Sequence, residues 1–91
     1  MSGQTPVRIY STSFCSYCDR ARALLSRKGA AYTEFKVDED PASRVEMLRL
    51  SGGRRSVPQI FIGDLHVGGF DDLYALERSG KLDSLLGAAV S

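Results

Sequence analysis

The sequence contains no tryptophan, only two cysteines, and no long run of apolar residues. A membrane-spanning helix needs about 20 consecutive, mostly apolar residues, so the sequence predicts no membrane span. A fold held by disulfide bonds would use more cysteines, spread along the chain. The formal net charge is +1, with no excess of either sign. This balance argues against nucleic acid or a membrane surface as the partner.

The rest of the composition is that of an ordinary globular domain. The chain has 91 residues, of which 43% are hydrophobic and 25% charged. This length predicts a single domain over residues 1–91 with a modest core, ordered over about residues 6–87. Residues 1–6 are polar and lack the apolar stretch of a secretory signal. We therefore expect the protein in the reducing cytoplasm.

The hydrophobic pattern predicts four strands and four helices. The strands are expected at Val7–Ser11, Tyr32–Val37, Gln59–Ile62 and Leu65–Val67, where β-branched and aromatic residues gather. The first helix should begin at Ser16 and stop at Gly29. The second should begin at Pro41 and stop at Gly52, and the third should follow Gly68-Gly69 and stop at Gly80. A short last helix should contain Leu82, Leu85 and Leu86, with a frayed tail after Gly87.

The connections between these elements predict how the strands pair. The strand–helix–strand unit at the start of the chain implies two parallel strands. The two-residue turn Gly63-Asp64 implies an antiparallel hairpin. The order β-α-β-α-β-β-α plus a short C-terminal helix therefore predicts an α/β fold: a four-stranded mixed sheet with helices on both faces. In the second helix, Val45 and Leu48 are expected on the buried side.

The two cysteines are three residues apart and lie where the first strand gives way to the first helix. A bridge between Cys15 and Cys18 would close a very small loop, so it would stabilise the fold little. At a helix N-terminus, unpaired N–H groups and the helix dipole favour an anion, which suits the Cys15 thiolate. The thiolate is the species that attacks a disulfide. Cys18 lies one turn later on the apolar side, close enough to resolve a mixed disulfide.

Two other interpretations of the cysteine pair are weaker. Inert packing cysteines seldom begin a helix after a polar turn. A structural zinc site usually takes four protein ligands, and the chain offers one histidine, His66, far from the pair. We interpret His66 as an ordinary surface histidine and favour a solvated loop for Arg54-Arg55, although these arginines could also attract an acidic ligand. The sequence therefore predicts a redox pair and no metal site.

Three motifs in order resemble the glutaredoxin family over nearly the whole chain. Cys15-Ser16-Tyr17-Cys18 is similar to the family's CPYC, and residues 56–62, SVPQIFI, are similar to its TVPQIFI. Residues 68–73, GGFDDL, are similar to a third segment. The resemblance is strongest to small bacterial dithiol members. It implies a thioredoxin-like fold and a glutathione-dependent thiol–disulfide oxidoreductase that reduces protein–glutathione mixed disulfides and protein disulfides.

The resemblance also implies a glutathione site. In the family, the proline that matches Pro58 follows a cis peptide bond and faces the cysteines, and the backbone at Val57 pairs with the extended tripeptide. The backbone at Phe70 and Asp71 holds the γ-glutamyl carboxylate, and an aspartate carboxylate contacts the amino group. The full set implied as catalytic and glutathione-binding is Cys15, Cys18, Thr12, Tyr17, Ser56, Val57, Pro58, Gly69, Phe70, Asp71 and Asp72.

The sequence departs from the family at two positions in this site. Many members have a lysine where this chain has Thr12, so either the glycine carboxylate of glutathione is held less tightly or an arginine such as Arg20, Arg54 or Arg55 compensates. Ser16 replaces the proline of CPYC. In some members, loss of that proline accompanies binding of a [2Fe–2S] cluster between two subunits, with Cys15 of each subunit and two glutathiones as ligands. The alternative to a monomeric reductase is therefore a cluster-bridged homodimer.

Overall fold

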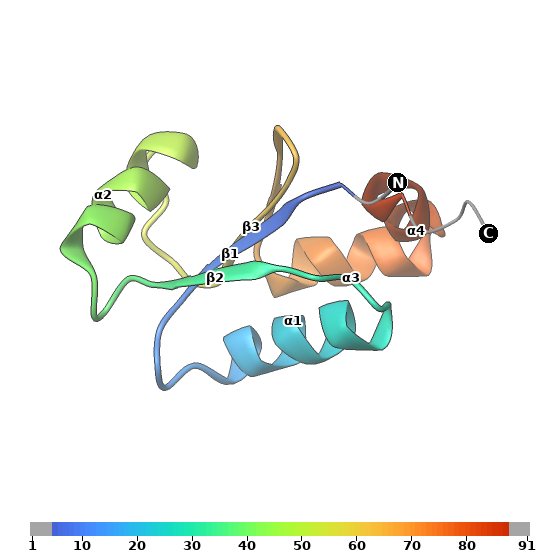
Figure 1. The fold of residues 1–91 in the computed structure, drawn as a ribbon, viewed down its shortest axis with the longest axis horizontal. Coiled ribbons are helices and arrows are strands. Elements are labelled where there is room, and N and C mark those ends of the chain that lie inside the picture. The colour runs from blue at the N-terminus through green and yellow to red at the C-terminus, as the bar shows by residue number, and fades with distance from the viewer. Residues whose placement is uncertain (1–4, 88–91) are drawn as a thin grey trace.

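The computed structural model describes residues 5–87, and the described part of the chain contains four strands and four helices (Figure 1). The strands are β1 (Val7–Ser11), β2 (Thr33–Lys36), β3 (Gln59–Ile62) and β4 (Leu65–Gly68). The helices are α1 (Ser16–Arg27), α2 (Pro41–Leu50), α3 (Phe70–Arg78) and α4 (Lys81–Leu86). The tail after Gly87, which the sequence predicts to fray, lies outside the described residues.

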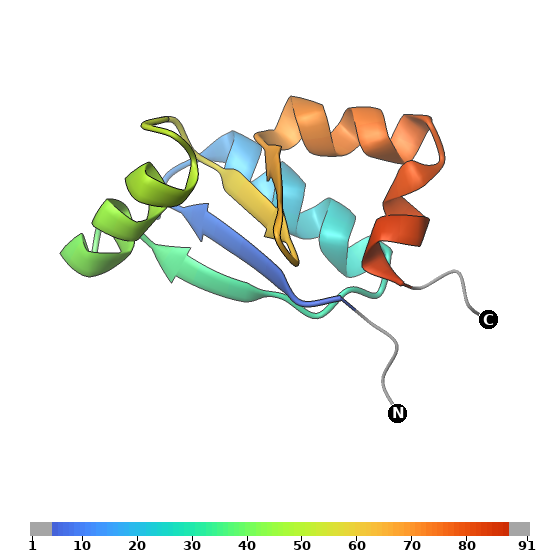
Figure 2. The ribbon, with the colours of Figure 1, turned by 90° about the horizontal axis from the view of Figure 1, so that it is seen from above.

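The four strands form one mixed sheet in the order β2-β1-β3-β4. β1 and β2 are parallel, with Tyr10 opposite Phe35, because α1 carries the chain back across the sheet. β1 and β3 are antiparallel, and so are β3 and β4, which form a hairpin with an irregularity between Ile60 and Phe61. The strands lie side by side between α2 at one end of the molecule and α4 near the other (Figure 2). The predicted fold class is confirmed.

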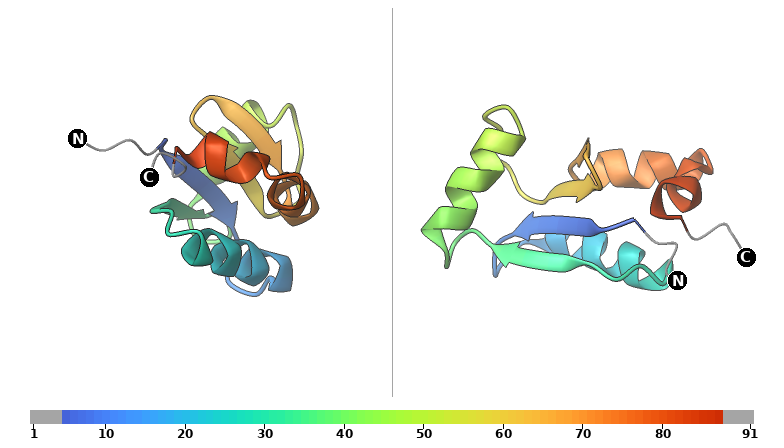
Figure 3. Two further views of the ribbon diagram at one scale, coloured as in Figure 1. Left: turned by 90° about the vertical axis from the view of Figure 1, so that its right-hand side faces the viewer. Right: turned by 45° about the horizontal axis from the view of Figure 1, so that its top comes forward.

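Alternation along β1 and β3 divides the core between the two faces of the sheet. One face carries the larger cluster, against α1, α3 and α4, with these strand and helix residues: Val7, Ile9, Ile60, Ile62, Ala21, Leu24, Leu25, Leu73, Leu82 and Leu86. The opposite face carries Tyr10 and Phe61, which pack with Val37 and with Met47 of α2. Figure 3 shows α1 running beside the strands on the first face. α1 and α3 therefore pack against the same face of the sheet.

The buried face of α2 differs from the prediction. Val45 is 64% exposed, whereas Ser43 and Met47 are buried, and Leu48 is partly buried against the second cluster as expected. Ser43 can be buried because its hydroxyl donates a hydrogen bond to Asp40 Oδ2, at 2.6 Å. Asp40 also accepts from the Ala42 N–H and caps the helix, as predicted. Apolar residues lie all around this helix, so their pattern points to no single face.

The predicted element boundaries otherwise agree with the structure to within about two residues. β2 is shorter than predicted, and β4 extends one residue further, to Gly68. None of the helices formed by residues 5–87 is long and apolar enough to cross a membrane. The fold thus brings the end of β1, the start of α1 and the start of α3 together around the cysteine pair.

Candidate active site

Cys15 is the N-cap residue of α1, with an extended backbone at φ −147°. Its sulfur accepts a hydrogen bond from the Cys18 N–H, with N and Sγ 3.2 Å apart. Its thiol donates to the carbonyl oxygen of Val57, at an Sγ–O distance of 3.9 Å. The side chain is partly exposed. A thiolate here is stabilised by the first N–H groups of α1 and by the positive end of the helix dipole.

Cys18 differs from Cys15 in both burial and acidity. Its side chain is fully buried. Burial, followed by its hydrogen bond with Cys15, raises the pKa of the Cys18 thiol to about 12. At neutral pH Cys18 is therefore a protonated thiol beneath the more exposed Cys15. The two sulfurs thus differ in accessibility, because Cys15 is partly exposed to solvent and Cys18 is buried.

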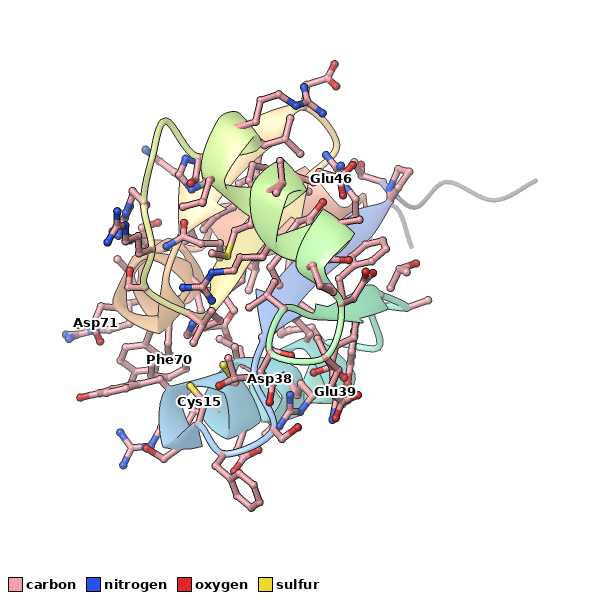
Figure 4. All side chains as sticks on the ribbon, turned by 90° about the vertical axis from the view of Figure 1, so that its left-hand side faces the viewer. Cys15, Asp38, Glu39, Glu46, Phe70 and Asp71 are labelled. Carbon is pink, nitrogen blue, oxygen red and sulfur yellow. The ribbon has the colours of Figure 1, made fainter. Side chains whose placement is uncertain are left out.

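The loop before Cys15 is held from a different part of the chain. The Ser13 N–H donates to Asp38 Oδ2 and the Ser13 hydroxyl to Glu39 Oε2, both at 3.1 Å. This backbone hydrogen bond is the main reason that the pKa of Asp38 lies below its usual value. Phe14 projects into solvent, at 98% exposed. Figure 4 shows Asp38 and Glu39 on one side of Cys15, with Phe70 and Asp71 on the other.

A groove of about 260 Å³ lies on the Phe70 side of Cys15. Its lining residues come from three separate segments: Tyr17, Arg54, Ser56, Val57, Pro58, Gly69, Phe70, Asp71 and Asp72. The Val57–Pro58 peptide bond is cis, as the resemblance implied. The groove adjoins the Cys15 sulfur, because Val57 both lines the groove and accepts the Cys15 hydrogen bond.

Thr12 does not line this groove. It is partly buried, and its backbone lowers the pKa of the Cys18 thiol, against the larger effect of burial. Arg54 does line the groove, although its sequence context favours a solvated loop. Both descriptions hold for this residue, because Arg54 is exposed and also borders the groove. The signal available in the sequence was its position four residues before Pro58.

The start of α3 forms one wall of the groove. Gly68 has φ +114°, a conformation that glycine tolerates and other residues rarely adopt. The Asp72 carboxylate accepts a hydrogen bond from the Gly69 N–H, at 3.0 Å, and so caps its own helix. Asp71 is exposed and lies at the edge of the groove near Phe70 (Figure 4). Asp72 is therefore engaged within the protein, whereas Asp71 faces the groove.

A hydrogen-bonded chain behind the groove corrects our interpretation of His66. The Gln59 side chain donates to the Ser56 carbonyl oxygen, at 2.9 Å, and its Oε1 lies 2.7 Å from His66 Nε2. The His66 ring stacks on Phe61, with centroids 4.8 Å apart. Burial lowers the pKa of His66. His66 is thus a half-buried residue that supports the Ser56 loop, and sequence spacing alone gave no sign of it.

A second polar network ties α1 to β2. Arg22 pairs with Glu34 and with Asp19, and the buried Ser11 hydroxyl donates to the same Glu34 carboxylate. Because Arg22 follows Cys18 by one turn of α1, this network fixes the part of the helix that carries the buried cysteine. Among residues 5–87, no three His, Cys, Asp or Glu side chains are grouped so that they could hold a metal ion.

Comparison with known proteins shows which family has this fold and this cysteine pair. The family model described as Glutaredoxin matches residues 7–67. A glutaredoxin of Pseudomonas aeruginosa is 55% identical over 83 residues, covering 91% of this chain and 98% of that protein. The solution structure of a Brucella melitensis glutaredoxin has a TM-score of 0.81 at 52% identity, covering 99% and 97% of the two chains. A buckwheat glutaredoxin–glutathione complex has a TM-score of 0.81 at 34% identity, over 90% and 76%.

The four-stranded sheet, the covering helices and the Cys15–Cys18 pair at the start of α1 define a thiol–disulfide oxidoreductase of the thioredoxin-like fold. Within that class, the chain belongs to the glutaredoxin family.

Proposed function

We propose that the protein is a glutathione-dependent oxidoreductase that reduces protein–glutathione mixed disulfides and protein disulfides. The observation that carries this proposal is the position of the partly exposed Cys15 sulfur, at the N-terminus of α1 and beside a groove of about 260 Å³. A related structure, the buckwheat glutaredoxin, was solved in complex with glutathione. That likeness supports glutathione as the groove's ligand in this chain.

The groove suits the chemistry of an extended acidic tripeptide. The N–H groups of the first turn of α3 have no partner within the helix and favour a carboxylate, here that of the γ-glutamyl end. The free carboxylate of Asp71 is the better candidate for its amino group, because Asp72 already binds the Gly69 N–H. Val57 offers its backbone to the central residue. Arg54 offers the positive charge that Thr12 lacks for the glycine carboxylate.

The first half of the cycle is a thiol–disulfide exchange at Cys15. The Cys15 thiolate attacks the glutathione sulfur of the mixed disulfide, a new S–S bond forms, and the protein sulfur leaves as a thiolate that takes a proton. The thiolate of a second glutathione then attacks the glutathione sulfur of this new bond. Oxidised glutathione leaves, and Cys15 is regenerated. Each turnover consumes one free glutathione, whose sulfur joins the glutathione of the mixed disulfide in oxidised glutathione while the protein thiol is restored, and no metal or flavin takes part.

Cys18 serves the second substrate class, protein disulfides. After Cys15 forms a mixed disulfide with such a protein, the Cys18 sulfur attacks Cys15, and the second protein sulfur leaves with the proton that Cys18 gives up. Two glutathiones then reduce the Cys15–Cys18 bridge. Because the Cys18 thiol is buried and its pKa is raised to about 12, Cys18 does not attack a substrate first and acts only after a mixed disulfide has formed on the adjacent Cys15. Cys18 is therefore dispensable for small mixed disulfides.

Two single variants test the mechanism with the mixed disulfide of cysteine and glutathione as substrate. Cys15→Ser is expected to abolish turnover, and Cys18→Ser is expected to keep it. Reduction of a protein disulfide should fail in both variants. Turnover that survives in Cys15→Ser would sink the mechanism, and circular dichroism of both variants shows whether the fold is kept.

The second candidate, a cluster-bridged homodimer, rests on Ser16 and on the sulfur ligands that the chain can offer. Ser16 is exposed at the first position of α1, and of the two cysteines Cys15 alone is partly exposed. One chain thus supplies one sulfur, so a [2Fe–2S] cluster would need two chains and two glutathiones. Anaerobic reconstitution with iron, sulfide and glutathione tests this. A colourless, monomeric product would leave the cytoplasmic monomeric reductase as the proposal.

A further inference from the structure

Three aromatic side chains form a row that leads away from the groove across α3. The ring centroids of Tyr17 and Phe70 are 6.4 Å apart, and those of Phe70 and Tyr74 are stacked at 5.8 Å. Tyr17 is 51% exposed and Tyr74 45%. We call Tyr17, Phe70 and Tyr74 the aromatic row. Exposed apolar surface that is grouped in this way marks a contact site.

Arginines border the aromatic row along its length. The Arg20 guanidinium lies 5.5 Å from the Tyr17 ring centroid, and that of Arg78 lies 6.0 Å from the Tyr74 centroid. Arg27 and Arg20 line a hollow of about 220 Å³ between α1 and α3, which Phe70 and Tyr74 also line. All three arginines are exposed, and in the described part of the chain none of them forms an ion pair. We call Arg20, Arg27 and Arg78 the arginine face.

Several other charged side chains near this face are held in ion pairs. Lys28 pairs with Glu77 and Asp83, and Asp19 pairs with Arg22. Two carboxylates, Asp71 and the capping Asp72, lie beside the row, so the three arginines of the arginine face exceed them by one.

On the opposite side of Cys15 the sign is reversed. The carboxylates of Asp38 and Glu39 are exposed and hold the Ser13 loop (Figure 4). The surface charge therefore changes sign across the reactive sulfur.

We propose that the arginine face and the aromatic row bind an acidic stretch of the substrate polypeptide that adjoins its reacting disulfide. The acidic side chains meet the arginines, and apolar side chains lie on the aromatic rings. The acidic carboxylates Asp38 and Glu39 repel the same stretch, so the substrate is oriented across Cys15 in one direction. The face is continuous with the groove through Tyr17 and Phe70, which is why the occupant is a polypeptide attached to the disulfide. This inference rests on the proposed function and adds its substrate preference.

Two synthetic peptides test the proposal. Each carries one cysteine as a mixed disulfide with glutathione, and they differ in having glutamates or lysines at the flanking positions. At low ionic strength we expect the wild-type protein to favour the glutamate peptide by about tenfold in kcat/KM, since three exposed charge pairs contribute modestly each. The preference should shrink at high salt, because such pairs are screened. The triple variant Arg20→Gln/Arg27→Gln/Arg78→Gln should lose it.

A matched control carries Arg44→Gln and Arg49→Gln on α2, which packs on the other face of the sheet. This variant should keep the preference. A wild-type protein that favours the lysine peptide, or a triple variant that still favours the glutamate peptide, overturns the proposal. The mixed disulfide of cysteine and glutathione is a separate arm. If the wild-type protein fails to turn it over, the proposed function itself fails. If all variants reduce it equally, the arginines act on the peptide alone.

Discussion

Replacing Gly68 by alanine perturbs the groove wall through a contact that the structure defines. Gly68 has φ +114°, and a Cβ at this position would lie 2.9 Å from Asp72 Cγ and closer still to its Oδ2. That oxygen accepts the hydrogen bond from the Gly69 N–H that caps α3. The substitution therefore strains the backbone and also pushes the capping carboxylate out of place.

Two costs combine in this variant. An alanine in the left-handed region costs about 1 to 2 kcal/mol. Loss of a helix N-cap costs about 1 kcal/mol more. Gly68→Ala is thus expected to lower the free energy of unfolding by about 2 to 3 kcal/mol. Gly80 supplies a matched control, because it has φ +81° and no heavy atom within 4 Å of a Cβ built on it. Gly80→Ala should lower the free energy of unfolding by the backbone cost alone.

Urea denaturation of four proteins, wild type, Gly68→Ala, Asp72→Ala and the double variant, separates the two costs. In the Asp72→Ala background the carboxylate is gone, so Gly68→Ala should cost about 1 kcal/mol less than in the wild type. Strictly additive free energies would refute the reasoning, because they would show that the Gly68 side chain and the Asp72 cap do not interact. Equal effects of Gly68→Ala and Gly80→Ala would refute it as well.

Three further predictions follow from burial and from proton binding. At neutral pH, iodoacetamide should alkylate Cys15 and spare the buried Cys18. Mass spectrometry of the digested protein will show which cysteine is alkylated, and alkylation of both at equal rates would contradict the burial of Cys18. The free energy of unfolding should fall as pH rises from about 9 toward 12. Cys18 and Tyr10 have pKa values raised to about 12 in the folded protein, so the unfolded chain loses their protons first; Cys18→Ala and Tyr10→Phe should each flatten this pH dependence. Met47→Ala should cost about 2 to 5 kcal/mol, whereas Val45→Ala should change stability by less than about 0.5 kcal/mol, since Met47 is fully buried and Val45 is 64% exposed; chemical denaturation will compare them.

Much of the fold could be predicted because strand alternation and helix caps are local signals. The strand at Val7–Ser11 and the helix start at Asp40-Pro41 both lie where the pattern placed them. The buried face of α2 could not be predicted in the same way. Its apolar residues surround the helix, and the choice of Met47 over Val45 is made by Tyr10 and Phe61 on the sheet beneath it. Such a choice depends on tertiary packing, which a periodic pattern does not contain.

The same distinction between local signals and tertiary contacts applies to the candidate site. Motif spacing placed Cys15 at the start of α1 and the segments around Pro58 and Phe70 beside one groove. The resemblance also implied Thr12, three residues before Cys15, and Thr12 is not among the residues that line the groove. His66 was misjudged because its partners, Gln59 and Phe61, belong to the neighbouring strand. Contacts across a sheet depend on strand register, and the irregularity at Ile60 shifts that register.

The groove is assembled from three segments that leave the ribosome at different times. Cys15 and Val57, which share a hydrogen bond, are 42 residues apart in the chain. The third segment of the groove contains Phe70 and Asp71 and is synthesised later still. A nascent chain that ends before α3 already carries both thiols but has no complete tripeptide site. Under the proposed function, glutathione affinity arises only after α3 has been synthesised, and its appearance in a series of truncated chains would time the completion of the groove.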